Sequence, residues 1–203
     1  MKNKKDITTE SLILKSAKRI FERKGMEGAR MQEIADEAGI NKALLHYYFR
    51  SKQLLFEAVF KNAFLLLAPS LNKVLNNDSS LFDKIRGFSN NYISFIIKHP
   101  YLPNFIIQEL NRNPNFLNQI IEKKHFPSIE KFKNQVDQGV ADGTIKPIDP
   151  FQLFINLVSL NILPFLAAPL LKSFLTINDA DYQQLLENRK TEVADFIINS
   201  IKA

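Results

Sequence analysis

Residues 30 to 52 constrain the fold of this chain more than any other segment, because they predict two short helices joined by a tight turn. The segment reads RMQEIADEAGINKALLHYYFRSK. Gly39 is expected to end the first helix, since glycine tolerates a left-handed backbone. Asn41 follows as a residue that can cap the second helix.

The apolar residues of this segment fall on one face of each predicted helix. Ile34, Ala35 and Ala38 supply the inward face of the first, and the small Ala35 lets the second helix cross close by. Leu45 and Phe49 are four residues apart and anchor the second helix to a core. The two helices are therefore expected to pack against each other.

Four residues of the second helix are left pointing outward: Lys42, Ala43, His46 and Tyr47. A helix with hydrogen-bonding groups and positive charge on its outer face can meet base edges and phosphates in the major groove. The segment therefore predicts a helix-turn-helix that reads double-stranded DNA.

Residues 12 to 60 resemble the N-terminal domain of the tetracycline-repressor (TetR/AcrR) family. They predict an amphipathic first helix, followed by IADEAGI and by HYYFRSK at residues 46 to 52, which is similar to the family's YYF-x-SK. The resemblance covers about a quarter of the chain at the level of motifs, and the rest matches in length and helical layout. It implies a homodimeric transcriptional regulator whose C-terminal domain binds a small-molecule inducer.

The chain departs from the family pattern at three positions. Arg30, with Met31 after it, stands where a Thr commonly precedes the family's second helix. His46 replaces the usual first aromatic residue of the YYF run, and Ala43 replaces a small residue or Gly. We expect these changes to alter which bases are read, with Arg30 still within reach of phosphate.

Each predicted DNA contact follows from the chemistry of its side chain. Lys42 can donate to guanine or phosphate, Tyr47 and Lys52 suit phosphate, and Ala43 suits a thymine methyl group. Two alternatives stay open, namely that Tyr47 packs in the core and that His46 contacts nothing. The predicted DNA-binding residues are Arg30, Gln32, Lys42, Ala43, His46, Tyr47 and Lys52.

The charge of the chain is uneven. Residues 1 to 62 carry 13 Lys and Arg against 8 Asp and Glu, whereas residues 63 to 203 carry 14 against 13. Such a surplus alone is often a solubility feature, but beside a helix-turn-helix it favours attraction to DNA. The absence of Cys and of an apolar stretch in MKNKKDITTE fits a cytoplasmic protein with no secretory signal peptide.

Composition and periodicity favour an all-α fold of about nine helices. The chain has 203 residues, of which 45% are hydrophobic and only six are Gly. We expect a three-helix DNA-binding domain over residues 1–50 and a helical ligand-binding and dimerisation domain over residues 51–203. Thr8 or Thr9 can cap the first helix, and Pro69 is expected to kink or end the fourth. Further predicted caps are Ser51, Asp149 and Asn178.

Residues 150 to 171 carry no charge and are long enough to cross a bilayer. Pro164 and Pro169 interrupt this segment, so we favour a soluble alternative over a transmembrane helix. In the resembled family the last two long helices form a four-helix dimer interface, and a twofold dimer implies an inverted-repeat operator. The predicted interface residues are Leu157, Val158, Ile162, Leu185, Leu186, Val193, Phe196 and Ile197.

The chain contains 17 Phe, a high number for its length, and many lie between positions 60 and 174. Most are expected in the core, but some can line a largely apolar cavity for an inducer. The resemblance implies that the ligand shifts the linker helix that begins at Ser51. The predicted ligand-binding residues are Phe88, Tyr92, Phe105, Gln108, Glu109, Phe132 and Asn161.

Enzymatic function is disfavoured by the residue pattern, and no cofactor is expected. The glycines form no phosphate-binding loop, and the three His are scattered. Glu122 and His125 have a spacing that could bind a metal, but a solvated surface pair is the simpler interpretation. Two alternatives remain: a regulator of the same fold controlled by a partner protein or by no ligand, and a helical enzyme or membrane-surface protein.

Overall fold

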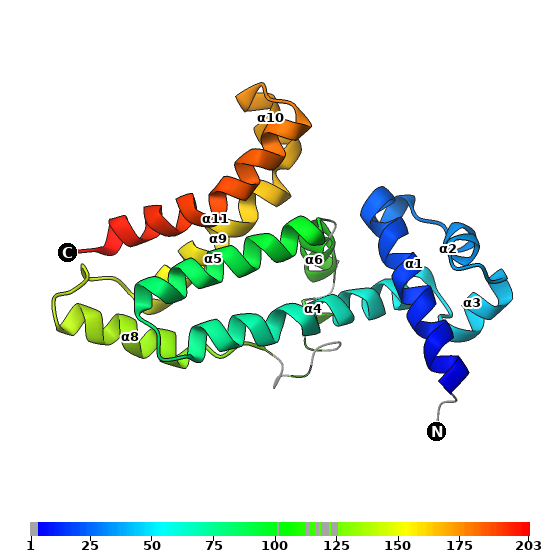
Figure 1. Ribbon diagram of the computed structural model, residues 1–203, viewed down its shortest axis with the longest axis horizontal. Coiled ribbons are helices and arrows are strands. Elements are labelled where there is room, and N and C mark those ends of the chain that lie inside the picture. The colour runs from blue at the N-terminus through cyan, green and yellow to red at the C-terminus, as the bar shows by residue number, and fades with distance from the viewer. Residues whose placement is uncertain (1–3, 101, 113, 117, 119–121, 123–125) are drawn as a thin grey trace. The chain divides into compact units, whose positions relative to one another are not determined.

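The computed structural model is all-α and describes every residue except 1–3, 101, 113, 117, 119–121 and 123–125 (Figure 1). Within the described residues there are ten helices, and the one β-type contact is an isolated bridge between Ile145 and Lys202. The predicted fold class is confirmed. The helices are α1 (Lys4–Gly28), α2 (Met31–Glu37), α3 (Lys42–Tyr48), α4 (Lys52–Asn76), α5 (Leu81–Lys98), α6 (Leu102–Arg112), α8 (Glu130–Ala141), α9 (Pro150–Leu166), α10 (Ala168–Leu175) and α11 (Asp179–Ile201).

The chain divides into two compact units. Unit 1 comprises residues 1–65 and 104–121, and unit 2 comprises residues 66–103 and 122–203. Helix α4 therefore contributes to both units, which differs from the predicted boundary after residue 50. The reason lies in the packing of the first half of α4. The ring of Phe56 is fully buried against Phe21 of α1, with centroids 4.7 Å apart.

The core of unit 1 is built on the apolar stripe of α1. Ile13, Ala17, Ile20 and Phe21 are all buried, as their helical spacing predicts. The prediction that Thr8 or Thr9 caps this helix is wrong. The helix begins at Lys4, so both threonines lie inside it. At its other end α1 continues past Gly25 with a kink, since Gly25 has φ 65° and ψ 179°.

Pro69 lies inside α4 and does not end it, contrary to the prediction. The helix continues to Asn76. A proline inside a helix removes one hydrogen bond to the carbonyl four residues earlier, here that of Leu65. Buried Leu67, Ala68 and Leu71 hold the second half of α4 in the core of unit 2. Tertiary packing thus stabilises the helix beyond Pro69, where local propensity predicts that it ends.

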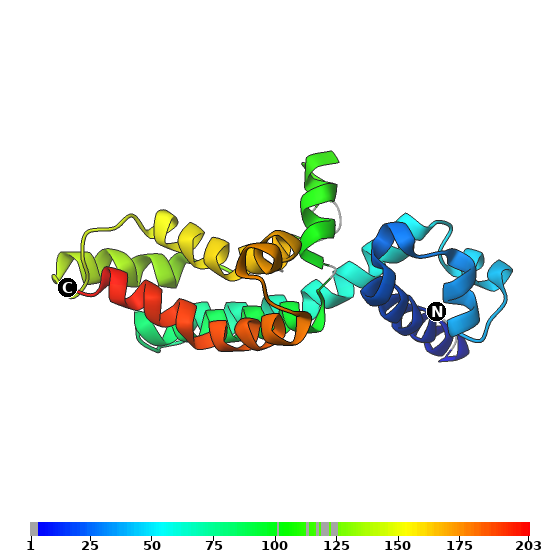
Figure 2. The same cartoon turned by 90° about the horizontal axis from the view of Figure 1, so that it is seen from above.

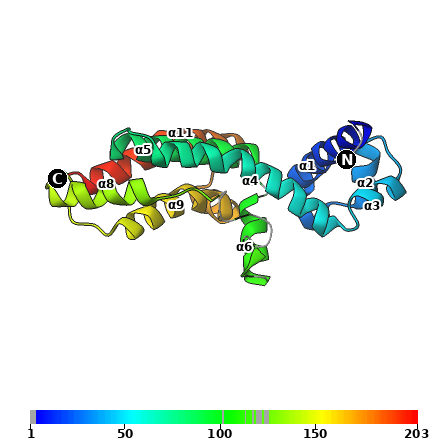
Figure 3. The same cartoon turned by 90° about the horizontal axis from the view of Figure 1, so that it is seen from below.

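Unit 2 is a bundle in which α11 lies along α5, α9 packs against both, and α8 packs against α5 and α9 (Figures 2 and 3). Its buried apolar residues form two clusters. One includes Ile85 and Phe88 of α5, and the other includes Ile93 and Ile96 of the same helix. Helix α5 therefore passes along both clusters.

A proline also lies inside α9, and α11 compensates for it. Pro164 cannot donate to the carbonyl of Leu160, which instead accepts from Nη2 of Arg189 at 2.7 Å. The carbonyl of Pro164 accepts from the hydroxyl of Tyr182 at 2.6 Å. Two side chains of α11 thus satisfy backbone groups around the proline.

Helices α9 and α10 meet at a bend of 77°, so residues 150–171 do not form one straight span. The pair passes a length and hydropathy test for crossing a membrane only when taken together. Helix α4 passes that test alone, a possibility that the sequence pattern had not raised. Core helices pass the same test, and the apolar residues of α4 named above are packed inside the two units.

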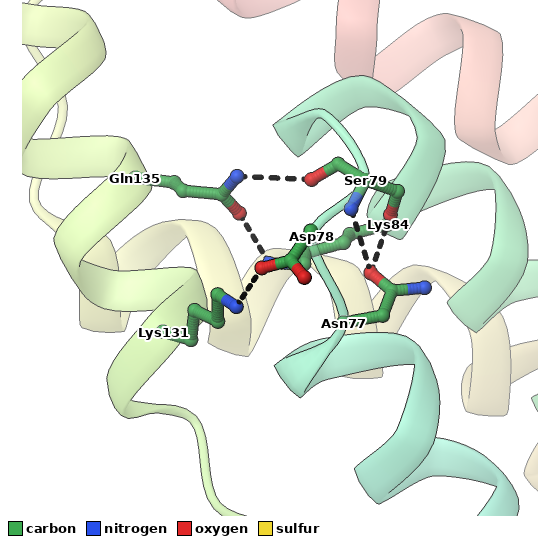
Figure 4. A network of polar contacts seen from close by, with 6 residues as sticks. All are labelled: Asn77, Asp78, Ser79, Lys84, Lys131 and Gln135. Atoms are coloured by element: carbon green, nitrogen blue, oxygen red, sulfur yellow. Dashed lines mark hydrogen bonds and ion pairs between the residues drawn. The ribbon is translucent and has the colours of Figure 1, made fainter.

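A polar network joins the α4–α5 turn to α8 (Figure 4). Lys84 is fully buried, and its Nζ donates to Oε1 of Gln135, whose Nε2 donates to the carbonyl of Ser79 at 2.9 Å. Beside it, Lys131 pairs with Asp78. Burial, followed by the nearby charge of Lys131, lowers the pKa of Lys84, while Asp78 opposes this shift.

Candidate nucleic-acid interface

The turn between α2 and α3 has the geometry that the sequence predicts. Gly39 has φ +65°, and its amide donates to the carbonyl of Asp36 at 3.0 Å. The next amide, of Ile40, donates to the carbonyl of Ala35, also at 3.0 Å. Oδ1 of Asn41 then accepts from the amide of Leu44 at 2.7 Å. The turn and the cap fix the direction in which α3 leaves α2.

The inward faces of both helices are confirmed. Ile34, Ala35 and Leu45 are fully buried, and Ala38 and Phe49 are 5% and 8% exposed. Because these five residues hold α2 and α3 against the core of unit 1, the remaining face of α3 has a defined orientation.

That remaining face carries the predicted DNA-contacting residues of α3. Lys42, Ala43 and His46 are exposed. Tyr47 is 79% exposed, and its ring is T-shaped against that of Tyr48, with centroids 5.4 Å apart. The alternative that Tyr47 packs in the core is therefore wrong. The outer face of α3 offers an ammonium, a methyl group, an imidazole and a phenol.

Arg30 and Gln32 are also exposed, at the start of α2. Arg30 occupies the N-cap position, where its side chain has no acceptor to offer, and Glu33 accepts weakly from the Arg30 amide at 3.4 Å. The amide nitrogen of the Gln32 side chain donates to Asp36 at 2.8 Å. Gln32 would have to give up that bond to meet a base.

Lys52 has a structural role that the sequence did not reveal. Its Nζ donates to the carbonyls of Glu27 and Ala29, each at 3.2 Å. These carbonyls belong to the end of α1 and the connection to α2. The ammonium predicted to bind phosphate therefore joins the start of α4 to this corner.

Two of the three acidic residues of α2 are paired with cations of α1. Lys24 lies 2.6 Å from Glu33, and Arg19 lies 3.2 Å from Glu37. The hydrogen bond from Lys24 is the main cause that lowers the pKa of Glu33. Two of the three negative charges of α2, the helix before α3, are thus countered within unit 1.

Arg50 is an exposed cation that the prediction left out. It lies in the short connection between α3 and α4, next to buried Phe49. Its place inside the HYYFRSK segment was the available signal, but α3 ends at Tyr48, so helical counting could not give its direction.

The predicted ligand-binding residues are divided between the two units. Phe88, Tyr92, Phe132 and Asn161 belong to unit 2, whereas Gln108 is exposed on α6 in unit 1. The side chains of Phe105 and Glu109 lie outside the described residues. In unit 2 the ring of Phe154 joins the set, with centroids 5.9 Å from Phe88 and 6.0 Å from Phe132.

Four of the predicted dimer-interface residues lie in the core of unit 2 instead of on its surface, so they are not available to a partner. Leu157, Leu186, Val193 and Ile197 are between 0 and 6% exposed. Val158, Ile162 and Leu185 are half-buried, and Phe196 alone is well exposed, at 65%. An almost wholly apolar helix does not reveal which face turns inward. The exposed apolar residues of α9 and α10 are Phe151, Ile155, Leu163, Leu170, Phe174 and Leu175.

The predicted metal alternative pairs Glu122 with His125. Glu122 is exposed, and His125 lies outside the described residues. Across the part of the chain that the structure describes, no group of three or more His, Asp or Glu side chains is placed to hold a metal ion.

Comparisons with known proteins agree with this geometry. Residues 13–59 match the family model described as bacterial regulatory proteins, tetR family. The HTH-type transcriptional repressor KstR2 of Mycolicibacterium smegmatis is 26% identical over 138 residues, covering 66% of each chain.

Two solved structures have the same fold. HlyIIR, a hemolysin II transcriptional regulator, has a TM-score of 0.64 at 24% identity, covering 97% of this chain and 98% of its own. FadR of Bacillus subtilis, in complex with stearoyl-CoA, has a TM-score of 0.66 at 14% identity, covering 94% and 98%. With the helix-turn-helix inside the matched residues, the N-terminal domain of this chain is that of the tetR family of bacterial regulatory proteins, and the whole chain has the fold of its members.

Proposed function

We propose that this protein is a ligand-responsive transcriptional repressor that binds an inverted-repeat operator as a homodimer and is released by a small, largely apolar molecule. The exposed face of α3 is the observation that carries the proposal. Lys42, Ala43, His46 and Tyr47 project from a helix whose other face is buried. A helix presented in this way fits the major groove, where its side chains can read bases.

Repression and release by a ligand are supported by the relatives. KstR2 is named a repressor, and the FadR structure holds stearoyl-CoA, a molecule with a long apolar chain. In this chain the aromatic rings of Phe88, Tyr92 and Phe154 make unit 2 a suitable environment for an apolar ligand. A ligand can release the protein from DNA only if it binds the DNA-incompetent state more tightly.

Dimerisation is supported by apolar side chains that unit 2 leaves exposed. Ile155 and Leu163 of α9 are each 54% exposed, and Phe196 of α11 is 65% exposed. A second copy would bury them. A twofold dimer would hold two α3 helices about 34–36 Å apart, or a multiple of that, and would require an inverted repeat. Such a regulator acts on DNA in the cytoplasm.

A second candidate is a regulator of the same fold that is controlled by a partner protein or by no ligand. Phe88 and Phe132 are at most 2% exposed and pack through Phe154. A core filled in this way favours that candidate, because a ligand would have to displace packed rings.

The proposal is tested by selecting duplexes from random DNA with the purified protein at physiological salt, followed by sequencing. Recovery of one inverted repeat supports a sequence-specific dimer and provides a probe for inducers. Lys42→Ala and Tyr47→Ala should bind the selected site more weakly while keeping the oligomeric state of the wild type. Recovery of unrelated sequences, bound with equal affinity and lost at moderate salt, would contradict sequence-specific binding.

A further inference from the structure

Two uncharged polar side chains lie inside unit 2, between its two apolar clusters. Ser89 of α5 and Asn161 of α9 are both fully buried. On α5 the residue before Ser89, Phe88, belongs to the first cluster, and Ile93 belongs to the second. On α9 the first cluster includes Leu157, and the second includes Phe165. We call this place the polar seam of unit 2.

The orientation of the Asn161 amide is fixed by its hydrogen bonds. Its Nδ2 donates to the carbonyl of Leu157 at 2.6 Å and to Oγ of Ser89 at 3.1 Å. The opposite orientation would set two acceptors, Oδ1 and the Leu157 carbonyl, against each other. Oδ1 therefore points elsewhere, and within the described residues it is a buried acceptor without a hydrogen-bond partner.

Tyr92 adds a second polar atom near the seam. It lies one helical turn after Ser89 on α5 and packs against both apolar clusters. Its ring stacks on Phe88, with centroids 5.4 Å apart and an interplanar angle of 20°. Burial raises the pKa of its hydroxyl to about 12, so the group stays protonated at physiological pH. As far as the described residues go, this hydroxyl makes no hydrogen bond.

A buried acceptor without a partner is costly, and an apolar side chain of similar size at position 161 would avoid that cost. A bound molecule that donates a hydrogen bond would also remove it. Since Asn161 accepts at Oδ1 and Tyr92 can both donate and accept, the two groups suit a molecule that carries a donor beside an acceptor. Apolar clusters on both sides suit a flat apolar body.

We propose that the polar seam is a binding site for a neutral, mostly apolar ring compound whose N–H or O–H group donates to Oδ1 of Asn161. The proposal rests on the proposed function, because it names the class of molecule to which the regulator responds. The hydroxyl of Tyr92 meets an acceptor on the same compound. The site selects the compound by its donor, since an analogue without one leaves Oδ1 buried and unpaired.

Two matched pairs of probe compounds measure the contribution of this donor to binding. The first pair is 2-quinolinone and coumarin, which differ by an N–H in place of a ring oxygen. The second pair is oxindole and 2-coumaranone, which differ in the same way at a smaller size and both keep a carbonyl acceptor. Binding to the purified full-length protein is measured by calorimetry, without DNA. At least one N–H compound should bind about tenfold or more tightly than its oxygen analogue.

Two variants assign the effect to Asn161. Asn161→Leu removes the acceptor, so its affinities for the two members of a pair should become equal. Asn90→Leu is the matched control, because Asn90 is exposed on α5, and it should keep the wild-type discrimination. The unfolding temperature gives a second test. Asn161→Leu should match or exceed the wild type, because the unpaired acceptor is gone.

The outcomes separate this proposal from the proposed function. Equal affinity within both pairs, or no binding of any probe, overturns the polar seam as a ligand site. A lower unfolding temperature for Asn161→Leu, with unchanged discrimination, also overturns it by showing that Asn161 is purely structural. Failure of the DNA selection while the probes still discriminate would contradict the repressor and leave the ligand site standing.

Discussion

Arg189 of α11 donates through Nη2 to the carbonyl of Leu160 in α9, at 2.7 Å. This carbonyl is available because Pro164, four residues later, has no amide hydrogen to offer. An arginine on one helix thus replaces the hydrogen bond that a proline removes from another. The bond explains why α9 reaches Leu166 despite its internal proline.

Replacing this arginine should weaken unit 2. Arg189→Met keeps much of the apolar stem but leaves the Leu160 carbonyl without its donor. We expect a loss of about 1–3 kcal/mol in the free energy of unfolding, measured by denaturant titration. Gln183→Met on the exposed side of α11 is the control and should change it by less than about 0.5 kcal/mol. Equal effects of the two substitutions would show that the bond contributes little.

The left-handed turn at Gly39 should reject a β-carbon on conformational grounds alone. Nothing lies within 4 Å of the position that the new atom would occupy, so Gly39→Ala tests backbone strain without a clash. The expected cost is about 1–2 kcal/mol of unfolding free energy. Gly39→Asn should cost less, because Asn tolerates this conformation better. An alanine variant as stable as the wild type would exclude strain at this turn.

Lys42 should bind DNA mainly through its charge. Lys42→Ala is expected to weaken binding to all sequences and to reduce by about 1 the slope of log affinity against log salt. His46→Ala should instead change the preference among base pairs and leave the slope nearly constant. Lys98→Ala, an exposed cation of unit 2, serves as the control in the same fluorescence titrations. A slope that Lys42→Ala leaves intact would place Lys42 away from phosphate.

The buried Lys84 should make stability depend on pH. Burial lowers its pKa in the folded protein below the usual 10.5, so between the two values the unfolded chain binds more protons. Stability contributed by this residue therefore rises with pH in that window. Lys84→Met should lack this rise and should be at least as stable as the wild type near pH 7. Parallel urea titrations from pH 7 to 10 measure the difference, and superimposable pH profiles would refute it.

A substitution at Phe196 should prevent dimerisation without unfolding the protein. Phe196→Glu places a charge on the proposed dimer surface and should yield a folded monomer in sedimentation equilibrium. Leu157→Ala, which cuts a fully buried side chain, should instead cost about 2–5 kcal/mol of unfolding free energy. Gln183→Glu is the charge-matched control on α11 and should remain dimeric. A dimeric Phe196→Glu protein would exclude this face of α11 from the interface.

The sequence predicted best where one residue determines a local conformation. Gly39 adopts the left-handed conformation expected of glycine. Each of four predicted caps accepts a backbone hydrogen bond at the start of its helix: Asn41, Ser51, Asp149 and Asn178. The outward face of α3 also followed from counting, because that helix has a single apolar side. The local chemistry of single residues was therefore sufficient to predict most of the α2–α3 segment.

Prediction failed where tertiary contacts override local preference. Pro69 and Pro164 sit inside helices because surrounding packing, and in one case Arg189, compensates for the missing hydrogen bond. Leu157 and Ile197 could not be assigned to a core or to an interface, since α9 and α11 carry apolar residues on more than one face. The partners of such residues are distant in sequence, and periodicity does not identify them.

The two hydrogen bonds of Lys52 change what this lysine can contribute to DNA recognition. Any phosphate that attracts its ammonium competes with the carbonyls of Glu27 and Ala29, so the gain from the new contact is reduced by the loss of the old ones. An exposed lysine such as Lys42 bears no such cost. Lys52 therefore stabilises the connection between α1 and α2 more than it strengthens binding to DNA.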